Sequence, residues 1–160
     1  MSKSDAHKLA EVYVEQFLNY GDTILSDLKT PPHTLKISDD KTSAVLDFPP
    51  QDADGFAVVL TADHHGIVVH AGKLSHTHFD EGADVRQNVE RAFGYARDLL
   101  SPKMRLLERR AGGRPYWSGT QIFDGHDWQS EQTTGLFIWS FFGKRTSHIM
   151  MNRQLPARDS

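Results

Sequence analysis

The stretch from residue 56 to residue 101 constrains the fold more than any other part of the chain. Two apolar runs, 56–61 and 67–70, flank a polar turn that contains glycine, and this order predicts a β-hairpin. Between residues 84 and 101, apolar side chains recur at steps of three and four, which predicts an amphipathic helix. Asp84 is its predicted N-cap, with Gln87 three residues on as in a capping box. The chain therefore combines an antiparallel pair of strands with a helix that has one apolar face.

The remaining residues supply a second helix and several more strands. Apolar residues between Leu9 and Leu28 fall on one stripe of a helix, although Gly21 weakens its middle. Two helices cannot supply the crossovers that a parallel sheet of many strands requires. Further strands are predicted at residues 34–37, 43–48, 104–110, 116–123, 136–142 and 147–151, with the last two paired as a hairpin.

These elements predict the α+β fold class. We expect a single domain over residues 1–160, in which a mostly antiparallel sheet of about seven or eight strands carries both helices on one face. A length of 160 residues suits one domain with a substantial core. Residues 153–160 are polar and are expected to form a frayed tail.

Composition limits the chemistry and the cellular setting. The chain contains no cysteine, so a metal site would have to use histidine and carboxylate ligands. No apolar run approaches the roughly 20 residues that span a bilayer, and the first residues lack the apolar core of a signal peptide. We expect a soluble, cytoplasmic protein that does not enter a membrane.

Charge is divided unevenly along the chain. Residues 1–81 hold 13 acidic and 6 basic side chains, whereas residues 82–160 hold 8 and 12, and the formal net charge is −3. Such a division can orient a charged partner, or it can reflect ordinary solvated faces that separate along the sequence. The acidic total argues against a general nucleic-acid binder.

The segment His76-Thr77-His78-Phe79-Asp80 is the sharpest local feature. Alternate residues of an extended segment point to one face, so His76, His78 and Asp80 would project together and could hold one divalent metal ion such as Zn²⁺. Glu81 could then act as a general base in a small metal-dependent hydrolase. In one alternative, the histidines form local hydrogen bonds at a half-exposed strand end and Asp80 helps to cap the following helix. In another, the segment is a polar binding face without a metal ion.

The same segment resembles the His-x-His-x-Asp-His signature of metallo-β-lactamase-like hydrolases. The likeness covers five residues and stops at Glu81, where that family has its last histidine. The chain is also too short for the αββα fold that this resemblance implies. Of the other histidines, His64 and His65 are expected in a solvent-facing turn, and His70 could join His76 only if the chain reverses near Gly72.

A basic and aromatic segment follows the second predicted helix. Arg110 and Arg114 surround a glycine turn that leads into Tyr116 and Trp117. The turn does not follow a phosphate-loop pattern and does not precede a helix. Arginine beside aromatic residues suits protein recognition, so these four residues are candidate partner-binding residues; the alternative is an ordinary hairpin turn with a basic rim.

The succession of features resembles a known group of proteins. A hairpin ending in His-x-His-Phe-Asp, an amphipathic helix, a Gly-Gly-Arg-Pro-Tyr strand and a Trp after Asp-Gly together resemble small bacterial α+β proteins of uncharacterised or toxin-immunity type, over residues 56–130. This resemblance implies a cytoplasmic, non-catalytic protein without a cofactor that binds a protein partner such as a toxin. The alternatives are the hydrolase described above and a homo-oligomer that associates through the aromatic strand 136–142.

Overall fold

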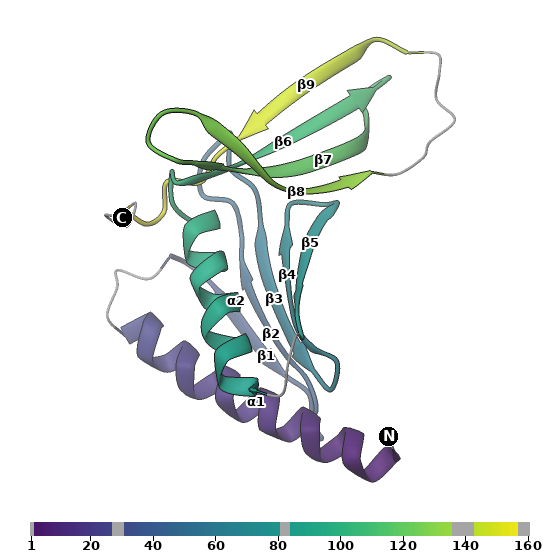
Figure 1. Ribbon diagram of the computed structural model, residues 1–160, viewed down its shortest axis with the longest axis vertical. Coiled ribbons are helices and arrows are strands. Elements are labelled where there is room, and N and C mark those ends of the chain that lie inside the picture. The colour runs from purple at the N-terminus through teal and green to yellow at the C-terminus, as the bar shows by residue number, and fades with distance from the viewer. Residues whose placement is uncertain (1, 27–30, 81–83, 136–142, 157–160) are drawn as a thin grey trace.

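The computed structural model describes residues 2–26, 31–80, 84–135 and 143–156, in which two helices and two antiparallel sheets form an α+β fold (Figure 1). In chain order, the elements are α1 (Lys3–Ser26), β1 (Thr34–Ile37), β2 (Ala44–Phe48), β3 (Val58–Asp63), β4 (Gly66–Ala71), β5 (Ser75–Phe79), α2 (Val85–Leu99), β6 (Met104–Ala111), β7 (Arg114–Phe123), β8 (Trp128–Gly135) and β9 (Arg145–Met150).

The first sheet is a meander in which β1 to β5 follow one another in chain order. Burial alternates along β2 and β3, because successive side chains of a strand point to opposite faces. The turn between β3 and β4 consists of His64 and His65, with Asp63 opposite Gly66. Gly72 has a φ of 63°, a left-handed conformation that glycine adopts without steric cost, and it reverses the chain between β4 and β5.

Both helices lie on the same face of the first sheet (Figure 1). They contact each other through Phe17 and Phe93, whose ring centroids are 5.0 Å apart. Helix α1 continues through Gly21, where a Cβ atom would lie 3.4 Å from the Phe93 ring, so the glycine allows the two helices to approach closely. Asp84 caps α2 as its sequence predicts, accepting a hydrogen bond of 3.2 Å from the backbone N–H of Gln87.

The second sheet contains four strands in the order β8-β7-β6-β9 and lies across one end of the first sheet (Figure 1). Helix α2 starts near the end of β5 and brings the chain to this opposite end, where β6 begins. Polar contacts join the second sheet to the first sheet and to α2. The Ser75 and Ser118 hydroxyls lie 2.6 Å apart, and the Tyr95 hydroxyl on α2 lies 3.1 Å from the Thr120 hydroxyl on β7.

The segment after β9 packs against the rest of the fold. Asn152 is fully buried, accepts a hydrogen bond from the Phe56 backbone N–H, and donates to the carbonyl oxygens of Phe56 and Leu99. Leu155 is buried, and its backbone N–H donates to the Leu100 carbonyl. The prediction of a frayed tail is therefore wrong for residues 153–156, because long-range hydrogen bonds and an apolar anchor hold them; the rest of that tail lies outside the described residues.

The predicted α+β class, the antiparallel pairing and the placement of both helices on one face are confirmed. The nine described strands form two sheets, whereas we predicted one sheet of about seven or eight strands. The division occurs because, among the described strands, β5 pairs only with β4, and the chain continues from β5 into α2. The predicted strand 136–142 lies outside the described residues, and its expected partner segment contributes to β9, which pairs with β6.

None of the helices in the described part of the chain combines the length and the apolar character needed to cross a membrane.

Candidate functional site

Three histidines gather on the face of the first sheet that points away from the helices. His70 on β4 lies opposite His76 on β5, and their ring centroids are 5.9 Å apart. His76 and His78 have centroids 5.2 Å apart, as expected for alternate residues of one strand. The reversal at Gly72 thus brings His70 to the predicted pair, and we call these three residues the histidine strip.

The surroundings of His70 in the histidine strip favour its neutral form. His70 pairs with Val59 on β3, and His78 pairs with Val68 on β4, so apolar side chains adjoin the rings on this face. Partial burial lowers the pKa of His70 below its usual value, and the nearby His76 and His78 lower it further because like charges repel. His70 is therefore harder to protonate than an isolated imidazole.

The strip does not assemble the predicted metal ligands. Asp80 follows the last residue of β5 and is exposed, and Glu81 lies outside the described residues. Within the part of the chain that the structure describes, no three histidine, aspartate or glutamate side chains gather closely enough to hold a metal ion. The alternative of a zinc hydrolase that uses His76, His78 and Asp80 therefore stays a prediction.

The four candidate partner-binding residues are distributed over different parts of the second sheet. Arg110 donates from Nε to Glu108 of the same strand, and Glu108 is buried on the side of the sheet that faces the core. Arg114 is exposed at the start of β7, and Tyr116 is half-buried beside a register shift of the β6–β7 pair. Trp117 lies on the opposite side of the sheet from Glu108.

Two arginines stack on two tryptophans on that opposite side. The guanidinium carbon of Arg109 lies 4.7 Å from the centroid of the Trp117 ring, and that of Arg105 lies 4.2 Å from the Trp128 ring. Gly119 provides the space for Trp117, since a Cβ atom there would come within 2.8 Å of the indole.

Apolar side chains extend this surface. Phe123 is 41% exposed and lies with its ring centroid 5.3 Å from that of Trp128, while Ile149 on the edge strand β9 is 53% exposed and pairs with Leu107. The surface has the aromatic and arginine composition that is enriched at protein interfaces. We call it the outer face; it consists of Arg105, Leu107, Arg109, Trp117, Phe123, Trp128 and Ile149.

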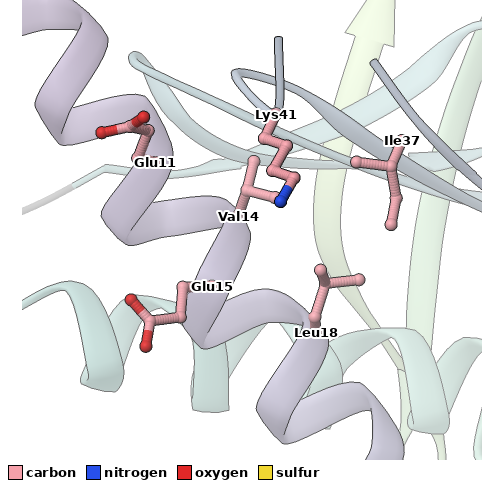
Figure 2. A pocket seen from close by; sticks show the side chains of 6 residues that line it. All are labelled: Glu11, Val14, Glu15, Leu18, Ile37 and Lys41. Atoms are coloured by element: carbon pink, nitrogen blue, oxygen red, sulfur yellow. The ribbon is translucent and has the colours of Figure 1, made fainter. Parts of the chain in front are cut away.

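A separate groove lies between α1 and the hairpin formed by β1 and β2. Its volume is about 530 Å³. Figure 2 shows Glu11 and Glu15 one helical turn apart on α1, Ile37 and Lys41 on the hairpin, and apolar side chains of α1 between them. The groove is lined by Glu11, Val14, Glu15, Leu18, Ile37 and Lys41.

Comparison of the chain with family models, with curated proteins and with solved structures found no match.

The predicted partner-binding residues did not include Arg105 or Arg109, and no prediction covered the groove. Arg105, Leu107 and Arg109 occupy every second position of β6, so their side chains point to one side of the sheet. This spacing could have placed the two arginines on the face that carries Trp117. No local sequence pattern indicates the groove, because it forms only where α1 packs against the hairpin in the folded chain.

Proposed function

We propose that this protein is a non-catalytic binding module that recognises a protein partner through the outer face. The single observation that carries this proposal is the pair of arginine–tryptophan stacks beside the exposed Phe123 and Ile149. Tryptophan and arginine are the residues most enriched among those that dominate binding energy at interfaces. A strand surface of this composition supplies flat apolar area together with directed N–H donors.

The charge of the outer face indicates the chemistry of its partner. Arg105 and Arg109 are cationic, and the seven residues of the face include no acidic side chain. A partner surface that presents carboxylates among apolar groups would complement them. Arg105 already donates from Nε to Gln121 at 2.7 Å, so its guanidinium is held in position before a partner arrives.

A single-stranded nucleic acid is the competing occupant, because bases stack on tryptophan and phosphates bind arginine. The net charge of −3 opposes this reading, since nucleic-acid-binding domains are typically basic. A labelled single-stranded oligonucleotide is expected to show no saturable binding at physiological salt. Tight, salt-dependent binding of the oligonucleotide would contradict the proposal and would indicate a nucleic-acid-binding protein.

The main experiment is capture of the partner from the producing cells, followed by cross-linking and mass spectrometry. Cross-links should map to the outer face, and the double variant Arg105→Glu/Arg109→Glu should lose the captured protein because it reverses both charges. Arg86→Glu on α2 is the matched control and should retain the captured protein, since Arg86 is exposed on a different element. Capture that survives the double variant would contradict the proposal.

The resemblance to toxin-immunity proteins supports a narrower proposal, in which the partner is a bacterial toxin that the chain neutralises. The captured protein should then arrest growth when it is expressed alone and lose that effect when it is co-expressed with this chain. The double variant should fail to protect, whereas Arg86→Glu should protect fully. A captured protein that is not toxic would be compatible with the binding function but would contradict the immunity role.

A further inference from the structure

We propose that the groove between α1 and β1 is a second binding site, which takes an extended peptide that carries apolar and basic side chains and pairs with the edge of β1. This site is distinct from the outer face, because it lies on the first sheet and on α1. The two proposals can therefore fail independently.

The first argument is the edge of the sheet. Among the described residues, β1 pairs only with β2, so its other edge presents backbone N–H and C=O groups that an added strand can bind. Leu35 and Ile37 are each 45% exposed, which is unusual for large apolar side chains on the helix-covered side of a sheet. Their register opposite the buried Leu46 and Ala44 places them on that side.

The second argument is the shape and the apolar character of the groove. Val14 and Leu18 lie on α1 and Ile37 on β1, so both walls contribute apolar side chains (Figure 2). A strand added beside β1 would direct alternate side chains into this space, since alternate residues share one face. The volume of about 530 Å³ accommodates several such side chains.

The third argument is charge. Glu11 and Glu15 are exposed and lie on successive turns of α1 along the groove, and Glu11 has a histidine neighbour, His7, at 3.5 Å. Two carboxylates favour an occupant whose inward side chains include lysine or arginine. Lys41 is the one cation among the six lining residues, so its removal should favour a basic occupant further.

A second copy of the chain fits this charge pattern less well. In an antiparallel β1–β1 pair, the residues that face α1 would be Leu35 and Ile37 of the other copy, and both are apolar. Lys36, the basic residue of β1, would point to the opposite face. The carboxylates of Glu11 and Glu15 would therefore gain no cationic partner, and a separate peptide with basic side chains satisfies them better.

The test uses the full chain and a fluorescently labelled, blocked octapeptide. Valine and lysine alternate at its odd positions and threonine occupies its even positions, so one face of the extended peptide is both apolar and basic. We expect saturable binding in fluorescence anisotropy that weakens as salt is raised. A peptide with glutamate in place of lysine, and one with N-methyl groups on alternate backbone amides, should both fail to bind.

Matched variants then locate the site. Glu11→Gln/Glu15→Gln should weaken binding about tenfold, because two exposed charge pairs are lost. Lys41→Gly should strengthen binding by about threefold, because it removes one repulsive charge. Ile37→Ser should weaken binding, whereas Glu131→Gln on β8 should leave it unchanged.

Three results would overturn the proposal. The first is no saturable binding of the lysine peptide, or equal binding of the N-methylated peptide. The second is tighter binding of the glutamate peptide together with a loss of binding in Lys41→Gly, which would indicate an anionic occupant. The third is a dimer in sedimentation experiments that Ile37→Glu converts to monomer, which would assign the groove to a second copy of the chain.

Discussion

His70 on β4 and His76 on β5 lie directly opposite each other, with ring centroids 5.9 Å apart. Their proximity arises at Gly72, whose left-handed backbone reverses the chain so that the two strands pair. A Cβ atom at this glycine would come within 2.6 Å of the Leu106 side chain, so the reversal also depends on close packing with the second sheet. Two imidazoles held this close cannot both become charged without repulsion.

The pKa of His70 predicts how stability depends on pH. Partial burial and the charges of His76 and His78 lower it below the ordinary value of 6.5. Between the lowered value and 6.5, the unfolded chain binds more protons than the folded chain. The contribution of His70 to the free energy of unfolding is therefore complete above pH 6.5 and decreases as the pH falls through this window.

Urea unfolding at pH 7.5 and pH 5.0 checks this dependence. His70→Thr should lose less stability between the two pH values than the original chain loses. His126→Thr, in the exposed turn between β7 and β8, is the control and should follow the original chain. Identical pH dependence in the original chain and in His70→Thr would contradict the prediction.

Zinc titration separates the binding module from the alternative of a metal-dependent hydrolase. We expect no stoichiometric Zn²⁺ binding to the untagged protein in isothermal titration calorimetry, because no three ligands gather among the described residues. His76→Ala should then be indistinguishable from the original chain. One Zn²⁺ per chain, lost in His76→Ala and retained in His7→Ala, would restore the hydrolase reading.

The buried Asn152 predicts a large loss of stability on truncation. Its side chain makes three hydrogen bonds of 3.1 Å, two with the backbone of Phe56 and one with the carbonyl of Leu99. Asn152→Ala leaves these backbone groups without partners, so the free energy of unfolding should fall by about 3 kcal/mol. Chemical denaturation measures this change.

The neighbouring Arg153 supplies the control for that measurement. Arg153 forms an exposed ion pair with Asp54 at 3.0 Å. Exposed ion pairs contribute little, so Arg153→Ala should lower the free energy of unfolding by less than about 1 kcal/mol. Equal losses in the two variants would show that the segment as a whole, and not the amide of Asn152, stabilises this end of the fold.

Local patterns were sufficient for part of this structure. The period of two placed His76 and His78 on one face, and the sequence Asp84-x-x-Gln87 located the start of α2. Both predictions depend on residues that lie close together in the sequence, where backbone geometry determines the outcome. The α+β class follows from the same kind of evidence.

Long-range packing determined what the sequence could not reveal. Asn152 lies 96 residues from Phe56 along the chain, so nothing near Asn152 indicated that this polar residue is buried. The register of β4 with β5, which adds His70 to the strip, depends on where the turn at Gly72 places the strands. The two-sheet arrangement and the stacking of Arg109 on Trp117 likewise depend on partners that only the folded chain brings together.

Lys41 and Lys36 occupy the same hairpin but differ in backbone conformation, and glycine should affect them in opposite directions. Lys41 has a φ of 56° at the end of the β1–β2 turn, where its N–H donates to the Ser38 carbonyl at 2.9 Å. A left-handed conformation costs a residue with a side chain about 1–2 kcal/mol, which exceeds the entropic cost of glycine. Lys41→Gly should therefore raise the free energy of unfolding by about 0.5–1 kcal/mol.

Lys36 lies within β1, where glycine has no conformational advantage. Lys36→Gly should lower the free energy of unfolding by about 0.5–1 kcal/mol, because glycine raises the conformational entropy of the unfolded chain and relieves no backbone strain in the strand. Thermal and urea unfolding of both variants measure the two changes. If both variants are destabilised, the Lys41 side chain must stabilise the groove in the absence of a ligand by more than its backbone strain costs.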